Sequence, residues 1–431
     1  MLYKNLSVNN EGHLTIAGVD SVYLAKKYGT PLYVMDEELV RHRCRIQQSA
    51  IEKYCAPGSM ILFASKALSM KEMYRIAKQE NIGVDVVSSG ELYTALSVDF
   101  PAEKIFFHGS SKTDFDISYG IDNGIGYFIV DNVEELEAIS EYAGKKDVTQ
   151  NILLRLAPGI DPHTFEAVKT GKVDSKFGVA IETGQAMEIT EKALNTPNVQ
   201  LMGFHCHIGS QIFDIEPFCD GADIMLGFMK EVKDKFGFET EILNIGGGLG
   251  VKYVEGEPEI DYHQCIVDAC KYVNDKCDEK GLRQPILLME PGRSIVADAG
   301  VTLYTVNSTK TIPGYKSYIA VDGGMGDNPR FALYGAKHSA LIANKASEPA
   351  DFHCTLAGRC CESDDVICED IDIQKAERGD IAAVLTTGAY NYSMASNYNR
   401  VCRPPIVMLK GGEDRVVVRR ETFDDLTACD L

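Results

Sequence analysis

The sequence lacks the features that mark secreted, membrane-spanning and nucleic-acid-binding proteins. The N-terminal residues contain no apolar signal-peptide core, and no apolar run approaches the roughly 18 residues of a membrane-spanning helix. Basic residues are in the minority, with 43 lysines and arginines against 63 acidic residues, so the net charge is -20. Such a charge repels phosphate backbones and anionic membranes. We therefore expect neither a nucleic acid nor a membrane as a partner.

Cysteine is plentiful but lacks the arrangement of a disulfide framework. The 13 cysteines are an odd number, and no two of them form a Cys-x-x-Cys pair. These features predict a reducing compartment, the cytoplasm, in which most cysteines act as small buried hydrophobes. Histidine is scarce, with nine in the chain, and His205 and His207 have no third histidine nearby in the sequence. We expect no metal site, while a zinc hydrolase built on this pair stays open as an alternative.

The first two thirds of the chain repeat a short apolar run followed by a segment of helical period. Continuous apolar runs are typical of parallel strands that are covered on both faces. Eight such units predict a (β/α)8 barrel of the TIM type. An open doubly wound sheet is less favoured, because no Gly-x-Gly-x-x-Gly turn follows the first run. The runs are residues 61–64, 83–87, 105–107, 127–130, 152–156, 201–205, 242–245 and 286–290.

After residue 295 the pattern changes to segments typical of strands, separated by glycine turns. These segments predict a second, mainly β domain at the C-terminus, and the β-like stretch at residues 12–18 is expected to join it. A chain of 431 residues is long enough for two such domains. The predicted divisions are an N-terminal β segment (1–34), the barrel (35–294) and the C-terminal β domain (295–431).

In a (β/α)8 barrel, reactive groups gather at the carboxyl ends of the strands. A lysine follows the first run, a histidine and a serine follow the sixth, a glycine turn follows the seventh, and a glutamate and an arginine follow the eighth. We expect these side chains to meet at one mouth of the barrel. The residues are Lys66, His207, Ser210, Gly246, Gly247, Gly248, Glu290, Gly292 and Arg293.

The residue types at this mouth favour pyridoxal 5′-phosphate as the ligand. A partly desolvated lysine such as Lys66 forms imines, and consecutive glycines let backbone N–H groups approach a phosphate. Arg293 and Ser210 would complete the anion site, and Glu290 would keep a pyridine nitrogen protonated. Each signal also has a structural interpretation, namely an exposed lysine, a tight turn or a salt bridge. Their convergence at one mouth favours the cofactor.

Ordered motifs over nearly the whole chain resemble the fold-type III pyridoxal-phosphate-dependent decarboxylases, which have an alanine racemase-like barrel, and within them the diaminopimelate decarboxylases. The motif Gly-Pro-x-Cys-Glu-Ser-Gly-Asp of that family is altered here to Gly-Arg-Cys-Cys-Glu-Ser-Asp-Asp, which leaves Cys360 unexplained. The matching segments include Ala64-Ser65-Lys66-Ala67, His205-Cys206-His207-Ile208-Gly209-Ser210-Gln211, Asn244-Ile245-Gly246-Gly247-Gly248-Leu249-Gly250, Glu290-Pro291-Gly292-Arg293, Arg330-Phe331-Ala332-Leu333-Tyr334, Cys361-Glu362-Ser363 and Gly388-Ala389-Tyr390.

The resemblance implies a role for each of these residues. Lys66 would carry pyridoxal 5′-phosphate, His207 would stack on its ring and Glu290 would bind the pyridine nitrogen. Cys361 would be the proton donor and would reach across a homodimer interface into the partner's site. The remaining cofactor-binding residues would be Asp85, Ser210, Gly247, Gly248, Gly292, Arg293 and Tyr390. The substrate-binding residues would be Arg293, Arg330, Tyr334, Glu362 and Tyr390.

The implied reaction is decarboxylation of meso-2,6-diaminopimelate to L-lysine and carbon dioxide, the last step of lysine biosynthesis. This substrate carries a second amino-acid head, which requires a cation for its carboxylate and an anion for its ammonium. Arg330 and Glu362 would supply that pair of charges. Decarboxylases of ornithine, arginine or carboxynorspermidine remain alternatives. A racemase fits less well, because the Cys361-Glu362 loop and the Arg330 and Tyr334 pair resemble the decarboxylases. A non-catalytic relative that regulates a homologue is expected to lack Lys66 or Cys361, and both are present.

Overall fold

The structure is a computed structural model that describes residues 3–160 and 175–431. The chain divides into two compact units, which are described separately. The barrel unit comprises Arg43–Gly250 and Ile260–Ser294. The β unit comprises Met1–His42, Val251–Glu259 and Ile295–Leu431. Among the described residues, no helix combines the length and the apolar composition needed to cross a membrane.

The barrel unit contains a closed ring of eight parallel strands. Their order is β9-β11-β12-β13-β5-β6-β7-β8, and pairing of β8 with β9 closes the ring. All eight apolar runs of the sequence form these strands, so the prediction of a (β/α)8 barrel is confirmed. The strands are β5 (Met60–Ala64), β6 (Gly83–Val86), β7 (Ile105–Phe107), β8 (Tyr127–Val130), β9 (Gln150–Ala157), β11 (Val199–His205), β12 (Ile242–Asn244) and β13 (Ile286–Met289); β10 (Val179–Ala180) pairs with β9 outside the ring.

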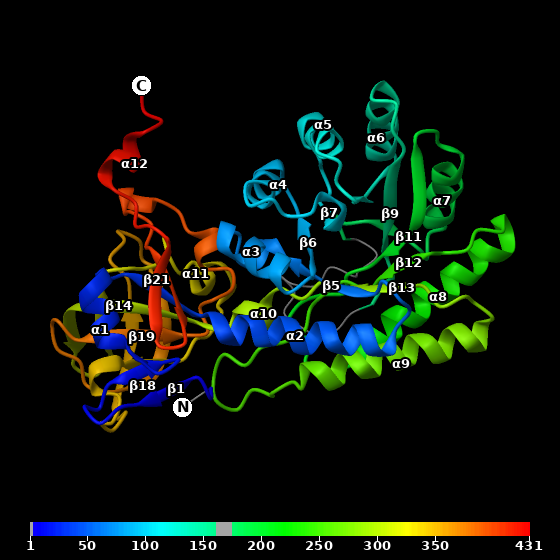
Figure 1. Cartoon of the computed structure of the whole chain (residues 1–431). Helices are drawn as coiled ribbons and strands as arrows, with labels where there is room; N and C mark the ends of the chain where they lie inside the picture. The colour runs from blue at the N-terminus through cyan, green and yellow to red at the C-terminus, as the bar shows by residue number, and fades with distance from the viewer. Residues whose placement is uncertain (1–2, 161–174) are drawn as a thin grey trace. The chain divides into compact units, whose positions relative to one another are not determined.

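Helices alternate with the strands, and Figure 1 shows α4, α5 and α6 outside the strands that precede them. Polar N-caps start several helices: the side chains of Ser88, Thr113, Asn132 and Asp261 each accept a backbone N–H of the first turn. The helices that follow barrel strands are α3 (Lys71–Gln79), α4 (Ser89–Leu96), α5 (Asp114–Asp122), α6 (Val133–Lys145), α7 (Gln185–Asn195), α8 (Glu216–Phe236), α9 (Tyr262–Lys280) and α10 (Arg293–Val296), and α2 (Glu37–Tyr54) precedes β5.

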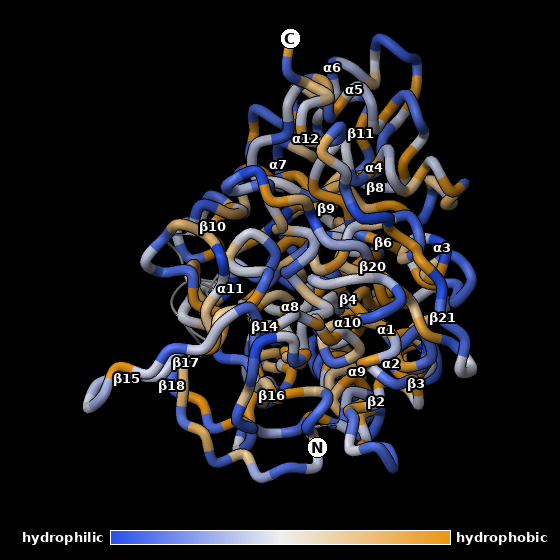
Figure 2. Tube along the Cα trace, turned by 90° about the vertical axis from the view of Figure 1, so that its left-hand side faces the viewer, coloured by the Kyte–Doolittle hydropathy of each residue, from blue (hydrophilic) through white to orange (hydrophobic). Residues whose placement is uncertain are grey.

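Apolar side chains fill the barrel, as expected of parallel strands covered on both faces. A buried cluster takes one residue from each of six strands, and Figure 2 shows hydrophobic residues alternating with hydrophilic stretches along the trace. This rigid packing fixes the strand ends on which the site is built. The cluster is Leu62, Phe106, Ile129, Leu153, Ile242 and Leu288.

The β unit is built on a sheet with the order β18-β17-β15-β14-β4-β20-β21, and β19 pairs with both β14 and β16. β4 (Leu32–Asp36) lies between β14 and β20, and Leu14 and Ile16 share a buried cluster with Val301 and Leu303. The mainly β domain therefore includes the N-terminal segment, as predicted. The other strands are β1 (Leu6–Val8), β2 (Leu14–Ile16), β3 (Val19–Asp20), β14 (Gly300–Ile312), β15 (Lys316–Val321), β16 (Ala340–Ile342), β17 (Phe352–Ala357), β18 (Val366–Ile373), β19 (Ile381–Leu385), β20 (Ile406–Lys410) and β21 (Glu413–Val418), and the helices are α1 (Ser21–Tyr28), α11 (Arg330–Tyr334) and α12 (Phe423–Thr427).

Candidate active site

Lys66 lies in a short helical turn directly after β5, at the carboxyl end of the barrel. Its side chain is exposed although Ser65 and Ala67 on either side are buried. Asp85, at the end of the neighbouring strand β6, is buried and its Oδ1 accepts the backbone N–H of Ser65 at 3.3 Å. Burial raises the pKa of Asp85 well above its usual value and the charge of Glu290 raises it further, while the charge of Lys66 opposes the shift. Lys66 thus brings an amine close to the acidic groups Asp85 and Glu91.

The glycine turn after β12 packs against His207. The backbone N–H of Gly247 donates to Nδ1 of His207 at 3.3 Å. A Cβ on Gly247 would lie 2.0 Å from the carbonyl oxygen of Glu290, and Gly248 has a φ of 128°, so side chains are excluded from this turn. Burial lowers the pKa of His207 well below its usual value, and the charge of Lys66 lowers it further. A neutral ring therefore lies beside the backbone of the turn.

A buried arginine and a serine are hydrogen-bonded to each other near this turn. Nη2 of Arg293 donates to Oγ of Ser210 at 3.0 Å, which brings together two residues from the ends of different strands. Arg293 is buried, and it is preceded by Gly292, whose Cβ would lie only 2.9 Å from the Cβ of Ala64. The ends of β13 and β5 therefore approach too closely for any residue larger than glycine. Sequence analysis placed Arg293, Ser210 and the glycine turn in one anion site, and the structure brings Arg293 and Ser210 into contact.

Glu290 lies in a network that sequence reasoning found only in part. His108 Nε2 lies 2.7 Å from Oε1, and Asn244 Nδ2 donates to the same oxygen at 2.7 Å. His205 Nε2 lies 3.2 Å from Oε2. Neither His108 nor Asn244 was predicted, although each lies at the end of a predicted strand. The end of the third run, which the sequence analysis did not use, is the signal that would have found His108, whereas Asn244 lies inside the seventh run just before the glycine turn.

The predicted residues of the β unit include a buried arginine. Arg330, at the start of α11, is 6% exposed, and its guanidinium lies 4.6 Å from the centre of the Tyr253 ring. Among the described residues, neither Nε nor Nη1 of Arg330 has a hydrogen-bond acceptor. Tyr334 follows one helical turn later and is exposed. A buried cation with unused donors requires an anion, so this part of the β unit is suited to a carboxylate ligand.

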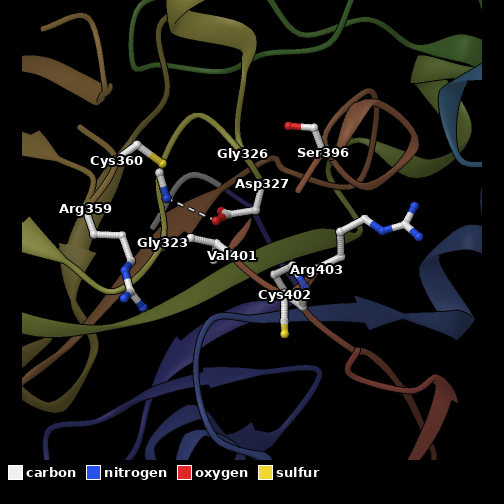
Figure 3. Close-up of a pocket in the computed structure, with 11 residues that line it drawn as sticks. Gly323, Gly326, Asp327, Arg359, Cys360, Ser396, Val401, Cys402 and Arg403 are labelled. Atoms are coloured by element: carbon white, nitrogen blue, oxygen red, sulfur yellow. Dashed lines mark hydrogen bonds between the residues drawn. The ribbon is translucent and has the colours of Figure 1, made fainter. Parts of the chain in front are cut away.

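The buried carboxylate of Asp327 holds the loop before α11. Figure 3 shows Asp327 among the residues that line a pocket of the β unit. Its Oδ2 accepts the backbone N–H of Gly324 at 3.0 Å, and its Oδ1 accepts the hydroxyl of Tyr304 at 2.5 Å. Burial raises the pKa of Asp327 to about 7, against the lowering effect of the Tyr304 hydrogen bond. The loop that delivers Arg330 to its position is therefore fixed from inside the β unit.

Cys361 and Glu362 lie together on an exposed loop of the β unit. The backbone N–H of Cys361 donates to Oδ1 of Asn399 at 2.8 Å, and the hydroxyl of Tyr398 donates to Oε2 of Glu362 at 3.3 Å. The neighbouring Cys360 is half-buried, and burial together with the charge of Asp365 raises the pKa of its thiol to about 11. Cys361 is thus the accessible thiol of the pair.

Tyr390 follows a close approach of two backbone segments. A Cβ on Gly388 would lie 1.8 Å from the carbonyl oxygen of Val296, and Tyr390 itself has a φ of 60°, in the left-handed region. Such a conformation costs about 1–3 kcal/mol in a bulky residue and is common at functional sites. The strain supports a functional role for this tyrosine.

Comparison with known proteins shows the family. Residues 39–297 match the family model described as "Pyridoxal-dependent decarboxylase, pyridoxal binding domain". The chain belongs to the pyridoxal-dependent decarboxylase family. It is 43% identical over 425 residues to the diaminopimelate decarboxylase of Bacillus subtilis, covering 98% of this chain and 96% of that one. It is 45% identical over 414 residues to the diaminopimelate decarboxylase of Bacillus methanolicus, covering 96% of each chain. These relatives place it among the diaminopimelate decarboxylases of the family.

A solved structure of this decarboxylase family extends the likeness to three dimensions. The diaminopimelate decarboxylase of M. jannaschii in co-complex with L-lysine superposes with a TM-score of 0.92 at 36% identity, covering 99% of this chain and 98% of that one. The decarboxylase family uses pyridoxal phosphate, and the residues at the barrel mouth fit that group. The exposed lysine fits the aldehyde of the cofactor. The turn that admits no Cβ and the Arg293–Ser210 pair fit its phosphate.

Proposed function

We propose that this pyridoxal-dependent decarboxylase converts meso-2,6-diaminopimelate to L-lysine and carbon dioxide. The observation that carries the choice of substrate is the buried guanidinium of Arg330, which has two nitrogens without an acceptor among the described residues. Ornithine, lysine and arginine have no second carboxylate to offer it, whereas meso-diaminopimelate has one. The curated relatives, named diaminopimelate decarboxylases over nearly their whole length, support the same choice.

We propose that the barrel unit holds the cofactor through the residues at its mouth. Lys66 carries pyridoxal 5′-phosphate, Arg293 and Ser210 bind the phosphate together with the backbone of the glycine turn, and Glu290 binds the pyridine nitrogen. The neutral ring of His207 stacks on the cofactor, for which its lowered pKa is suited. The other residues proposed to contact the cofactor are Asp85, Gly247, Gly248, Gly292 and Tyr390.

The distal end of the substrate is recognised by opposite charges. Arg330 binds the distal carboxylate and Glu362 binds the distal ammonium, with Arg293, Tyr334 and Tyr390 completing the site. Bound pyridoxal phosphate supplies the electron sink for the electron pair that remains when the bond from Cα to the carboxylate breaks. The thiol of Cys361 then gives its proton to Cα, and solvent restores that proton.

This function is tested by offering the purified, cofactor-loaded protein four amino acids separately. We expect carbon dioxide release from meso-diaminopimelate, and rates lower by at least about a hundredfold from ornithine, lysine and arginine, because a site built to bind a polar group rejects ligands that lack it. Carbon dioxide is trapped and counted. Turnover of ornithine with none of meso-diaminopimelate would overturn the substrate assignment.

We also propose that the protein is a homodimer in which Cys361 of one subunit serves the Lys66 site of its partner. Mixing inactive Lys66→Ala and Cys361→Ala subunits in equal amounts is expected to restore about one quarter of wild-type turnover. Half of the dimers are then mixed, and each mixed dimer has one complete site. If differently tagged subunits exchange and no activity returns, the shared site is refuted.

The state of the cysteines supports a reducing compartment such as the cytoplasm. All thirteen cysteines lie within the described residues, and none of them forms a disulfide. Cys361 can donate a proton only as a reduced thiol, and reducing conditions keep its side chain in that form.

A further inference from the structure

Glu290 is held by more side chains than its proposed contact with the cofactor requires. Asn244 Nδ2 donates to Oε1 at 2.7 Å, and His108 Nε2 lies 2.7 Å from the same oxygen. One donor, His205 Nε2, reaches Oε2 at 3.2 Å. The three residues come from the ends of three different barrel strands, and each is at most 5% exposed. A buried group with this many partners is fixed in position.

The number of donors determines which oxygen of Glu290 has room for another. An ionised carboxylate has about four acceptor positions, two on each oxygen. Asn244 donates to Oε1 and His205 hydrogen-bonds to Oε2. His108 Nε2 lies 2.7 Å from Oε1 as a close polar contact without hydrogen-bond geometry. Among the described residues, Oε2 therefore keeps one acceptor position open, while the close approach of His108 crowds the second position of Oε1.

The charges of the cluster are consistent with neutral donors around one anion. Burial lowers the pKa of His205 to about 4 and also lowers that of His108, although the charge of Glu290 opposes both shifts. Burial alone would raise the pKa of Glu290, but the two histidines lower it well below its usual value. At neutral pH the histidines are therefore neutral rings, and the carboxylate keeps its negative charge. Other ionisable groups that interact electrostatically with this cluster are Lys112, Arg155, Asp85, Cys206 and His207.

Asn244 also connects the carboxylate to the glycine turn. Its Oδ1 accepts the backbone N–H of Gly246 at 2.9 Å while its Nδ2 donates to Glu290. One fully buried amide thus sets the distance between the turn and the carboxylate. An aspartate at position 244 would occupy the same volume but would lose the donor and bring a second carboxylate against Glu290.

We infer that His108, Asn244 and His205 are positioning residues that fix Glu290 so that Oε2 has one acceptor position for the N–H of the pyridine ring. This inference rests on the proposed role of Glu290 as the group that binds the pyridine nitrogen. It adds three residues to that role and makes the alignment of the cofactor depend on them.

The test measures cofactor binding without any amino-acid substrate. Apoprotein is titrated with pyridoxal 5′-phosphate, and both the dissociation constant and the visible absorption band are recorded against pH. We expect His108→Leu and Asn244→Asp to weaken binding by about ten- to a hundredfold, which is the loss expected for a hydrogen bond to a charged group, and to alter the pH dependence of the band. His108→Gln keeps an N–H donor and should restore most of the affinity.

Two controls separate positioning from structure. Asn274→Asp changes an asparagine of α9 whose Nδ2 donates to the carbonyl of Tyr54, and it should leave cofactor affinity unchanged. Thermal unfolding of each variant shows whether it folds, and if Asn244→Asp does not fold, the His108→Leu and His108→Gln pair decides. Wild-type affinity and an unchanged band in folded His108→Leu would overturn the inference. So would a stoichiometric metal bound by His108, His205 and Glu290, whose ligand atoms lie within 4.8 Å of one another. Because no amino acid is present, the result does not depend on which substrate is decarboxylated.

Discussion

Replacing Lys66 by alanine is expected to abolish covalent attachment of the cofactor and to lower turnover by roughly four orders of magnitude or more. The exposed amine at the end of β5 is the lysine proposed to carry pyridoxal phosphate, so no other side chain is expected to replace it. The measurement is reduction of the loaded protein with borohydride, followed by mass analysis of the peptide that contains residue 66. The wild-type peptide should gain the mass of the reduced cofactor, and the variant should gain none.

Lys71→Ala provides the matched control for this result. Lys71 is also exposed and lies only five residues further on, at the start of α3. This variant should be labelled on Lys66 and should turn over substrate at the wild-type rate. A borohydride-stable adduct that persists in Lys66→Ala would refute the role of Lys66.

Replacing Arg330 by methionine is expected to reduce kcat/KM for meso-diaminopimelate through loss of the pair between the guanidinium and the distal carboxylate. Removing one partner of a buried charged pair costs about 2–5 kcal/mol, or roughly 30- to 5000-fold. Methionine keeps much of the apolar contact with Tyr253, so the fold should be preserved. Steady-state kinetics measure the change, and the absorption band of the cofactor should remain as in the wild type.

Lys337→Met tests whether the loss of any nearby positive charge has the same effect. Lys337 is exposed and lies shortly after α11, so its removal should leave kcat/KM within about twofold of wild type, as is usual for an exposed charge. Wild-type kinetics in Arg330→Met would show that Arg330 does not contact the substrate.

The barrel was predictable from the sequence because its physical signal is local. A parallel strand covered on both faces is a continuous apolar run, and residues 61–64 and 127–130 are as apolar as any in the chain. The positions of Lys66 and Arg293 were predictable for the same reason, because each comes shortly after a barrel strand and the carboxyl ends of these strands meet at one mouth. The N-terminal strands were assigned to the β domain from their β-like composition, and their packing on Val301 and Leu303 explains why they join it.

The rest of the site depends on contacts between distant segments, which the sequence does not display. Residues 251–259 follow a barrel strand but belong to the β unit, where Tyr253 lies under the guanidinium of Arg330. In the sequence, His108 is a polar residue directly after one apolar run and Asn244 is a polar residue inside another, and neither stands out as a site residue. Their importance became apparent only when the closed ring brought both to Glu290. The burial of a side chain also depends on contacts that the sequence does not display. Cys360 is half-buried and Cys361 is exposed, although the two side chains are identical, because the loop places them differently.

The most direct test of the central claim is the stoichiometry of the proposed reaction. Protein stripped of cofactor is incubated with meso-diaminopimelate, with and without added pyridoxal 5′-phosphate, and carbon dioxide and L-lysine are both counted. The account predicts equal amounts of the two products, formed only when the cofactor is added. Absence of L-lysine, or its formation at the same rate without the cofactor, would contradict it.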